Sequence, residues 1–155
     1  MEIERRWKIA GFPENLPLLR QAHMRQGYIA TAPVVRIRTD GARCVLCFKG
    51  KGTLAREEIE TDIDAETFRR LEAFIGKPLV SKDYRVYALP DGRRLEVSLV
   101  DEDLPTRFFY AEVEFDTVEQ AQASVPPADI GLQEEMTEDR GFSMSAYWKR
   151  TRLGD

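Results

Sequence analysis

Hydrophobic and polar residues alternate with a period of two along most of this 155-residue chain. Such a period is typical of β-strands, in which successive side chains point to opposite faces of the sheet. Turn signals separate the alternating segments, and the strongest is Asp40-Gly41. The pattern predicts about eight strands, over residues 2–9, 26–31, 34–39, 42–49, 57–63, 84–89, 93–100 and 108–115.

Helical patterns are fewer and lie between or after the strands. Asp64 is expected to cap a helix that ends at Gly76, because aspartate accepts hydrogen bonds from the first N–H groups and glycine readily adopts the left-handed conformation that ends a helix. The apolar stripe of this helix comprises Phe68, Leu71, Phe74 and Ile75. Thr117 is expected to cap a short second helix, and further helical turns are expected over residues 13–21 and 143–150. These elements predict an α+β fold that is mainly antiparallel β.

Length and composition fit a single domain, residues 1–155, with a buried core. The net charge of −4 argues against a nucleic acid polymer as the partner, because such a partner requires a basic surface. No apolar run approaches the roughly 20 residues of a membrane helix, and the N-terminal segment lacks the apolar stretch of a secretory signal. We therefore expect a cytoplasmic protein that binds no membrane.

The two cysteines, Cys44 and Cys47, have a C-x-x-C spacing within a predicted strand. Residues three apart in a strand point to opposite faces, whereas a redox pair of the thioredoxin type begins a helix. A structural zinc ion needs four ligands, and His23 is the single histidine. Both cysteines are therefore interpreted as ordinary strand residues, and His23 is given no role.

Each predicted strand is apolar on one face and charged on the other. The charged faces of the first and last strands are acidic, with Glu2, Glu4, Glu112 and Glu114. The third strand carries Arg36 and Arg38 on its charged face. An open sheet with its charged face in water explains the same alternation. The separation of the two signs favours instead a closed barrel with a charged interior, because like charges side by side repel unless a counter-ion lies among them.

The two kinds of charged face suit two parts of one ligand. Carboxylates at positions i and i+2 suit a hard divalent cation such as Mg²⁺ or Mn²⁺, which prefers oxygen ligands. Paired arginines suit phosphate oxygens, because a guanidinium group donates two parallel hydrogen bonds. A site with both groups predicts the binding of a polyphosphate together with metal ions.

Seven segments, in order along the chain, resemble the motifs of the CYTH, or triphosphate tunnel metalloenzyme, superfamily. The first, Glu2-Ile3-Glu4-Arg5-Arg6, is similar to the family's opening Glu-x-Glu-x-Lys signature. The others are Arg36-Ile37-Arg38, Phe48-Lys49-Gly50, Arg56-Glu57-Glu58-Ile59-Glu60, Lys82 with Arg85, Ala111-Glu112-Val113-Glu114 and Glu135-Met136-Thr137. The resemblance extends from residue 2 to about residue 148 and is strongest to the small bacterial members that hydrolyse inorganic tripolyphosphate.

The resemblance implies a closed eight-stranded tunnel barrel with a charged lumen, exterior helices and a C-terminal helix near one mouth. It also implies metal-dependent hydrolysis of a small-molecule triphosphate, with inorganic tripolyphosphate giving pyrophosphate and phosphate. The implied ligands of Mg²⁺ or Mn²⁺ are Glu2, Glu4 and Glu114, with Glu60 and Glu112 as further ligands or close neighbours. The implied catalytic residues are Glu4, Arg6 and Lys82. The implied phosphate-binding residues are Arg36, Arg38, Lys49, Arg56 and Arg85, together with Lys82.

Three positions depart from the family pattern. Arg6 stands where the family has lysine, which keeps the charge but enlarges the donor group. Ser98 stands where the family has an aspartate, which removes one carboxylate from the lumen. Arg85 lies one residue late for the family's Lys-x-Arg spacing after Lys82, so either a bulge turns its side chain inward or the side chain points outward.

Other functions are open from the sequence alone. A nucleoside or thiamine triphosphate is an alternative substrate, and a non-catalytic polyphosphate-binding protein is an alternative to an enzyme. The family's adenylyl cyclases carry a His-Phe element before the first Glu-x-Glu, whereas here Glu2 follows Met1 directly, so cyclase activity is not expected. Each charged residue can alternatively form a salt bridge that only holds the barrel in shape. Tyr147 and Trp148 either dock the last helix, which we favour, or form the contact of a homodimer.

Overall fold

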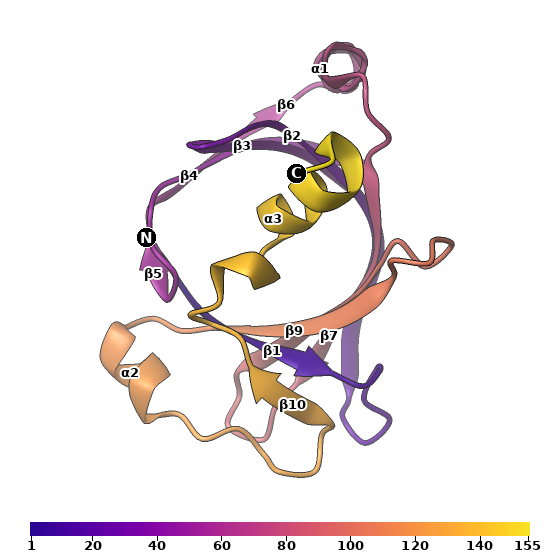
Figure 1. Cartoon of the computed structure of the whole chain (residues 1–155). Coiled ribbons are helices and arrows are strands. Elements are labelled where there is room, and N and C mark those ends of the chain that lie inside the picture. Colours follow the sequence, from indigo (N-terminus) through magenta and orange to yellow (C-terminus); the bar gives the residue numbers. More distant parts are fainter.

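The computed structural model describes residues 1–155 and is dominated by antiparallel strands. The strands are β1 (Glu2–Ile9), β2 (Leu18–Thr31), β3 (Val34–Asp40), β4 (Arg43–Lys49), β5 (Ala55–Arg56), β6 (Glu58–Ile63), β7 (Val80–Ala88), β8 (Arg94–Val100), β9 (Phe108–Glu114) and β10 (Leu132–Glu135). They follow the order β10-β1-β9-β8-β7-β2-β3-β4-β6 in one sheet. Viewed end-on in Figure 1, this sheet curls into a barrel.

The barrel closes through the short strand β5. Its two residues pair with β1, Arg56 opposite Glu2 and Ala55 opposite Ile3, while β6 follows one residue later and pairs with β4. The first strand of the chain is therefore joined to the far edge of the sheet, although over two residue pairs only. This closure confirms the predicted mainly antiparallel tunnel barrel and rules out an open sheet with its charged face in solvent.

The number of strands differs from the prediction of eight, because the structure has ten. The predicted strand over residues 57–63 corresponds to β6, which begins at Glu58, whereas β5 and β10 are additional short strands that both pair with β1. The helical turn expected over residues 13–21 is also wrong, since β2 begins at Leu18 and pairs with β7 from there on. This pairing occupies the backbone hydrogen-bonding groups of the segment and overrides the weak local preference.

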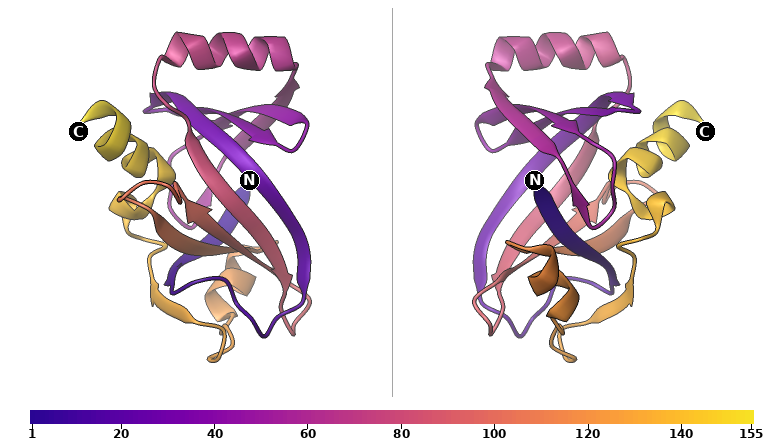
Figure 2. Two further views of the ribbon diagram at one scale, coloured as in Figure 1. Left: turned by 90° about the vertical axis from the view of Figure 1, so that its right-hand side faces the viewer. Right: turned by 90° about the vertical axis from the view of Figure 1, so that its left-hand side faces the viewer.

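The helices lie outside the barrel or at one of its ends (Figures 1 and 2). They are α1 (Ala65–Ile75), α2 (Val118–Ala123) and α3 (Met144–Trp148), with the 3-10 turn η1 (Arg140–Phe142) before α3 and the π-helical turn η2 (Lys149–Leu153) after it. The Asp64 and Thr117 side chains cap α1 and α2 as predicted, and Gly76 ends α1 with φ 70°. Of the predicted apolar stripe of α1, Phe68 is buried, whereas Phe74 is 79% exposed. No helix combines the length and the apolar character that crossing a membrane would require.

The main apolar core lies on the outer side of the barrel wall. It contains alternate residues of β1, β8 and β9, among them Trp7, Val97 and Val113, and is covered by Ala121 of α2 and by Ile130. Because successive strand residues point to opposite faces, burying these residues outside turns their charged neighbours toward the lumen. Packing of the apolar residues on the outside of the barrel therefore places the charged residues inside it.

A second apolar cluster attaches the C-terminal helix to the barrel. Tyr147 and Trp148 of α3 pack with Tyr28, Val80 and Val100, and Trp148 is only 1% exposed. Both aromatic residues therefore dock the helix within the chain, as favoured from the sequence. In Figure 1 this helix lies in front of the barrel opening, so the cluster fixes one mouth of the tunnel.

Candidate functional site

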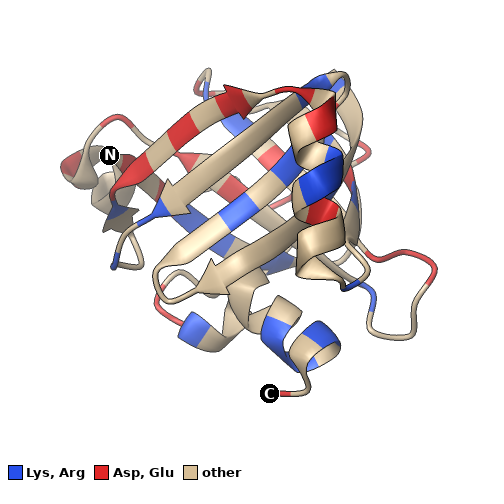
Figure 3. Cartoon of the chain, turned by 90° about the horizontal axis from the view of Figure 1, so that it is seen from above, with Lys and Arg blue, Asp and Glu red and all other residues tan.

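A cavity of about 140 Å³ occupies the interior of the barrel and is lined mainly by charged side chains. Figure 3 shows acidic and basic positions recurring along the strands that surround it. Eleven of the predicted site residues line this cavity: Glu2, Glu4, Arg6, Arg36, Arg38, Lys49, Arg56, Glu60, Lys82, Glu112 and Glu114. The fold therefore brings together residues that lie more than a hundred positions apart in the sequence.

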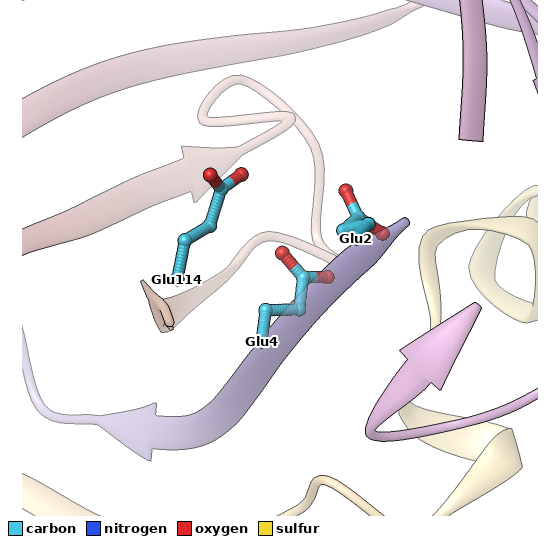
Figure 4. Close-up of side chains that lie close together, drawn as sticks. All are labelled: Glu2, Glu4 and Glu114. Carbon is cyan, nitrogen blue, oxygen red and sulfur yellow. The ribbon is translucent and has the colours of Figure 1, made fainter. Parts of the chain in front are cut away.

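Three of the carboxylates that line the cavity lie close together and are called its acidic part (Figure 4). Glu2 and Glu4 lie at i and i+2 on β1, and Glu114 of β9 is the cross-strand partner of Glu4. One carboxylate oxygen of each lies within 4.8 Å of those of the other two. Three oxygen donors from one sheet face, at this separation, suit a divalent cation that prefers oxygen.

The acidic part brings carboxylates together around the buried Glu4. Burial, with Glu112 and Glu2 close by, raises the pKa of Glu4 well above its ordinary value. Burial, with Glu2 and Glu112 nearby, also raises the pKa of Glu114. For Glu112 itself, burial acts in the same direction, but Arg6 and Lys82 outweigh it and lower its pKa. Repulsion that favours protonation of Glu4 and Glu114 would be relieved by a cation between them.

The basic part of the cavity has donors without partners. Arg36 is buried, takes part in no ion pair, and its Nε has no hydrogen-bond partner. The Nε of Arg38 is also buried without a partner, and its guanidinium group reaches Glu60 only at 3.8 Å. A buried guanidinium group without an anion is costly. Both groups therefore suit the oxygens of an anionic ligand.

Three further cations of the cavity, Arg6, Lys49 and Arg56, are paired with carboxylates. Arg6 contacts Glu4 at 3.2 Å and Glu112 at 3.1 Å, and its Nη1 donates a hydrogen bond of 3.0 Å to the Phe142 carbonyl beside α3. The larger donor group of an arginine thus links the carboxylates to the C-terminal segment. Lys49 contacts Glu2 at 3.2 Å and Glu58 at 3.3 Å. These pairs fit the alternative in which charged residues hold the barrel in shape, but the pairing leaves Arg36 free.

Lys82 is the most deeply placed amine of the cavity. Its Nζ donates a hydrogen bond to the Tyr110 hydroxyl and lies 5.1 Å from the centre of that ring. Burial, together with Arg36 and Arg38, lowers the pKa of Lys82 well below its ordinary value. Ser98, which is buried opposite Tyr110 in the neighbouring strand, supplies no carboxylate to counter this effect.

Arg85 is the one predicted site residue that does not reach the cavity. The pairing of β7 with β8 runs without a shift from Lys82 to Ala88, so no bulge turns Arg85 inward. Its side chain instead lies on the opposite face from Lys82, pairs with Asp83 at 3.0 Å and packs over the Phe12 ring at 3.7 Å. The position facing the lumen belongs to Tyr84, which lines the cavity.

Several further lining residues are absent from the predicted site, among them Glu58, Glu96, Tyr84 and Tyr110. The period of two places Glu58 on the face of Glu60, so the sequence pattern contains a signal for Glu58. Glu96 is the cross-strand partner of Glu112 and accepts a hydrogen bond from the Tyr84 hydroxyl. The tyrosines carry no charge, and only the strand pairing reveals which groups their hydroxyls meet.

The pKa of Glu96 predicts a dependence of stability on pH. Burial, with Glu112 nearby, raises this pKa to about 7 from an ordinary value of 4.5. Because the folded protein binds the proton more tightly than the unfolded chain, the stabilisation is complete below about pH 4.5 and is lost as the pH rises through 7. Glu96→Gln should therefore gain about 2 kcal/mol relative to the unchanged protein between pH 5 and pH 8. Urea unfolding of both proteins in a chelator at the two pH values measures this, and a difference that does not vary with pH contradicts it.

Comparison with known sequences connects this geometry to characterised proteins. No family model matches the chain. An inorganic triphosphatase of Nitrosomonas europaea is 34% identical to it over 148 residues, which cover 94% of this chain and 95% of the relative. The similarity thus covers nearly the full length of both chains.

Solved structures have the same architecture. The crystal structure of an inorganic triphosphatase matches with a TM-score of 0.67 and 31% identity, covering 95% of this chain and 93% of that one. A Hippeastrum protein, described as a putative adenylyl cyclase with a dominant triphosphatase activity, matches with a TM-score of 0.51 and 19% identity over 79% of this chain and 83% of its own. At that identity the second match supports the fold alone.

Proposed function

This chain belongs to the CYTH, or triphosphate tunnel metalloenzyme, superfamily, and we propose that it hydrolyses inorganic tripolyphosphate with the help of divalent metal ions held in the tunnel. The relationship to inorganic triphosphatases over nearly the full length of both chains supports hydrolysis of a triphosphate. The observation that carries the proposal is the cavity itself, in which buried guanidinium N–H donors without a hydrogen-bond partner share one small space with clustered carboxylates.

Glu2, Glu4 and Glu114 would hold Mg²⁺ or Mn²⁺, with Glu112 and Glu60 nearby. The donor set fits these ions, since it consists of carboxylate oxygens without sulfur or imidazole, and since burial together with Glu112 and Glu2 raises the pKa of Glu4. When bound, such an ion neutralises phosphate charge and lowers the pKa of a coordinated water molecule.

Arg36 and Arg38 would bind the phosphate chain through donors that have no partner in the protein. Lys49 and Arg56 are positioned to add further positive charge from the strands beside Glu2. Phosphoryl transfer needs little covalent assistance from the protein, so positioning and charge compensation supply most of the acceleration. Arg6 would keep Glu4 and Glu112 in place, because it contacts both carboxylates.

The reaction adds one water molecule across a phosphoanhydride bond. The water oxygen attacks the terminal phosphorus, the bridging P–O bond breaks, and pyrophosphate leaves with the electrons of that bond. Lys82 is suited to take up the proton from the attacking water, because burial and its cationic neighbours lower the pKa of its amine and so favour the neutral form. The products are orthophosphate and pyrophosphate.

The direct test is phosphate release from tripolyphosphate by the purified protein with Mg²⁺ or Mn²⁺, and again after chelation of the metal. We expect release of one orthophosphate and one pyrophosphate per tripolyphosphate, and none with chelator. Tight binding of tripolyphosphate without release would identify a binding protein instead. Release that persists in the chelator would overturn the assignment of the carboxylates as metal ligands.

A further inference from the structure

One edge of the barrel sheet, along β6, has no neighbouring strand. β6 is the last strand in the sheet order, and it pairs with β4 alone. The contact that closes the barrel is made by β5, which pairs with β1 over two residue pairs, and β6 extends beyond it. The middle of β6, from Ile59 to Asp62, is exposed. The closure therefore leaves a free strand edge, which we call the β6 edge.

The hydrogen bonds between β4 and β6 determine which backbone groups point to the β6 edge. The Gly50 N–H donates a hydrogen bond of 2.9 Å to the Glu57 carbonyl, so these two residues form a hydrogen-bonded pair. Such pairs recur at every second residue of an antiparallel ladder, and the register between β4 and β6 has no shift. The backbone groups of the odd-numbered residues of β6 therefore point to β4. Those of the even-numbered residues, Glu58, Glu60 and Asp62, point to the free edge.

The side chains of β6 form an acidic row on one face and an apolar row on the other. The even-numbered residues carry the carboxylates on the lumen side, and Glu58 and Glu60 line the inner cavity. On the outer side, Ile59 is 56% exposed and lies opposite Phe48 of β4, which is 40% exposed. Residues directly opposite each other in neighbouring strands have their side chains on the same face. A strand added at the β6 edge would therefore continue both rows.

The acidic row excludes a second copy of β6 as the added strand. In every antiparallel register that satisfies the free backbone groups, the even-numbered residues of the two copies lie opposite each other. Carboxylates would then face carboxylates, and like charges directly opposite are destabilising. Charged edge residues also protect a free strand edge from indiscriminate pairing. The partner of the β6 edge must therefore differ from β6 in its charge.

A strand with basic residues at alternate positions fits both rows. Its basic side chains would lie opposite the carboxylates of Glu58, Glu60 and Asp62, and the apolar side chains between them would cover Ile59. Asp62 is paired with Arg43 at 2.8 Å, but the side chains are 69% and 56% exposed, and ion pairs with such exposure contribute little. The carboxylate at this end of the row is thus available to a basic partner.

We propose that the β6 edge binds an extended segment of a partner protein in which lysine or arginine alternates with apolar residues. The segment adds to the sheet as an antiparallel strand, with hydrogen bonds to the backbone groups of Glu58, Glu60 and Asp62. Its basic side chains lie along the wall of the barrel, next to two residues that line the cavity. The inference does not depend on the proposed function, because it concerns a strand edge and not the ligand of the cavity.

The first test uses a short synthetic peptide in which lysine and valine alternate. Calorimetric titration in a chelator and without any phosphate compound measures its binding to the unchanged protein. We expect one peptide to bind per chain. The same peptide methylated on the backbone nitrogens of its lysine residues keeps every charge but cannot donate to β6, and it should bind at least about tenfold more weakly. Equal binding of both peptides would mean attraction by charge alone and overturns the proposal.

Two substitutions of one residue separate the backbone from the charge. Asp62→Pro removes an N–H group that points to the free edge, a position at which proline does not interrupt the ladder with β4. Asp62→Asn removes the same carboxylate but keeps the N–H group. We expect Asp62→Pro to bind the lysine–valine peptide about tenfold more weakly than Asp62→Asn. Equal affinities overturn the proposal, with urea unfolding as the check that both variants fold.

Hydrogen exchange tests the β6 edge without any variant. The amides of Glu58, Glu60 and Asp62 should exchange rapidly in the unbound protein and slowly with the peptide bound, whereas the amides of Ile59 and Thr61 should be slow in both states. Slow exchange of the first three amides in the unbound protein would show that the edge is already occupied. A dimer that Asp62→Pro dissociates, measured by analytical ultracentrifugation, would assign the edge to a second copy. Either result overturns the proposal.

Discussion

Replacement of Glu4 by glutamine is expected to lower the rate of tripolyphosphate hydrolysis by about 10²–10³-fold, the usual cost of removing one well-placed electrostatic group. Glu4 is buried, and its oxygen lies within 4.8 Å of those of Glu2 and Glu114. The amide keeps the size of the side chain but removes one negative charge from the proposed metal site. We therefore expect the concentration of Mg²⁺ or Mn²⁺ needed for half-maximal rate to rise as well.

The same substitution should leave the fold intact, which makes the result interpretable. The pKa of Glu4 is raised by burial and by Glu112 and Glu2, so a neutral side chain suits this position in the metal-free protein. Glu66→Gln on α1, whose carboxylate is 70% exposed, provides the control with the same chemical change far from the cavity. A Glu4→Gln protein that unfolds at the same urea concentration and hydrolyses at the unchanged rate contradicts the assigned site.

Much of the fold could be predicted from the sequence, because the alternation of apolar and charged residues indicates which face of each strand packs in the apolar core. Trp7 and Val113 are covered by apolar residues, and their neighbours Arg6 and Glu112 consequently face the lumen. The short strands β5 and β10 could not be predicted in this way, because two to four residues contain too little alternation. Their existence depends on the pairing with β1, a contact between distant parts of the chain.

The site shows a similar division. Arg36 and Glu114 could be assigned from period two and the family motifs, since alternation alone fixes the direction of a charged side chain. For Arg85 the motif and the alternation disagree, and the unbroken register between β7 and β8 decides for the outward direction. Tyr110 is buried, and its contact with Lys82 joins β9 to β7, two strands that lie on either side of β8, so the sequence pattern alone does not reveal it. Uncharged polar residues therefore set the limit of what the sequence pattern reveals.

A buried ion pair fastens the C-terminal segment, and it lies outside the cavity. Asp101 accepts hydrogen bonds from Arg152 at 2.7 and 3.2 Å, from the Tyr147 hydroxyl at 2.6 Å and from the Ser81 N–H at 3.0 Å. The side chains of Asp101 and Arg152 are 3% and 4% exposed. Arg152 also donates to the carbonyl groups of two residues between α1 and β7, so it links η2 to the barrel.

Arg152→Met is therefore expected to lower the free energy of unfolding by about 3–5 kcal/mol, the typical cost of leaving one partner of a buried pair without its counter-charge. The expected cause is the Asp101 carboxylate, which would be left buried without its counter-charge. Burial alone would raise the pKa of Asp101, but the hydrogen bonds from Arg152 and Tyr147 lower this pKa in the intact protein. Adding Asp101→Asn to Arg152→Met should recover part of the loss, since the unpaired charge is then absent.

Urea unfolding measures the free energy of unfolding of the unchanged protein and of both variants. Lys149→Met is the control, because Lys149 is an exposed cation on the same turn that forms no ion pair. A loss below about 1 kcal/mol for Arg152→Met, equal to that of the control, would mean that the apolar packing of α3 alone holds the C-terminal segment on the barrel.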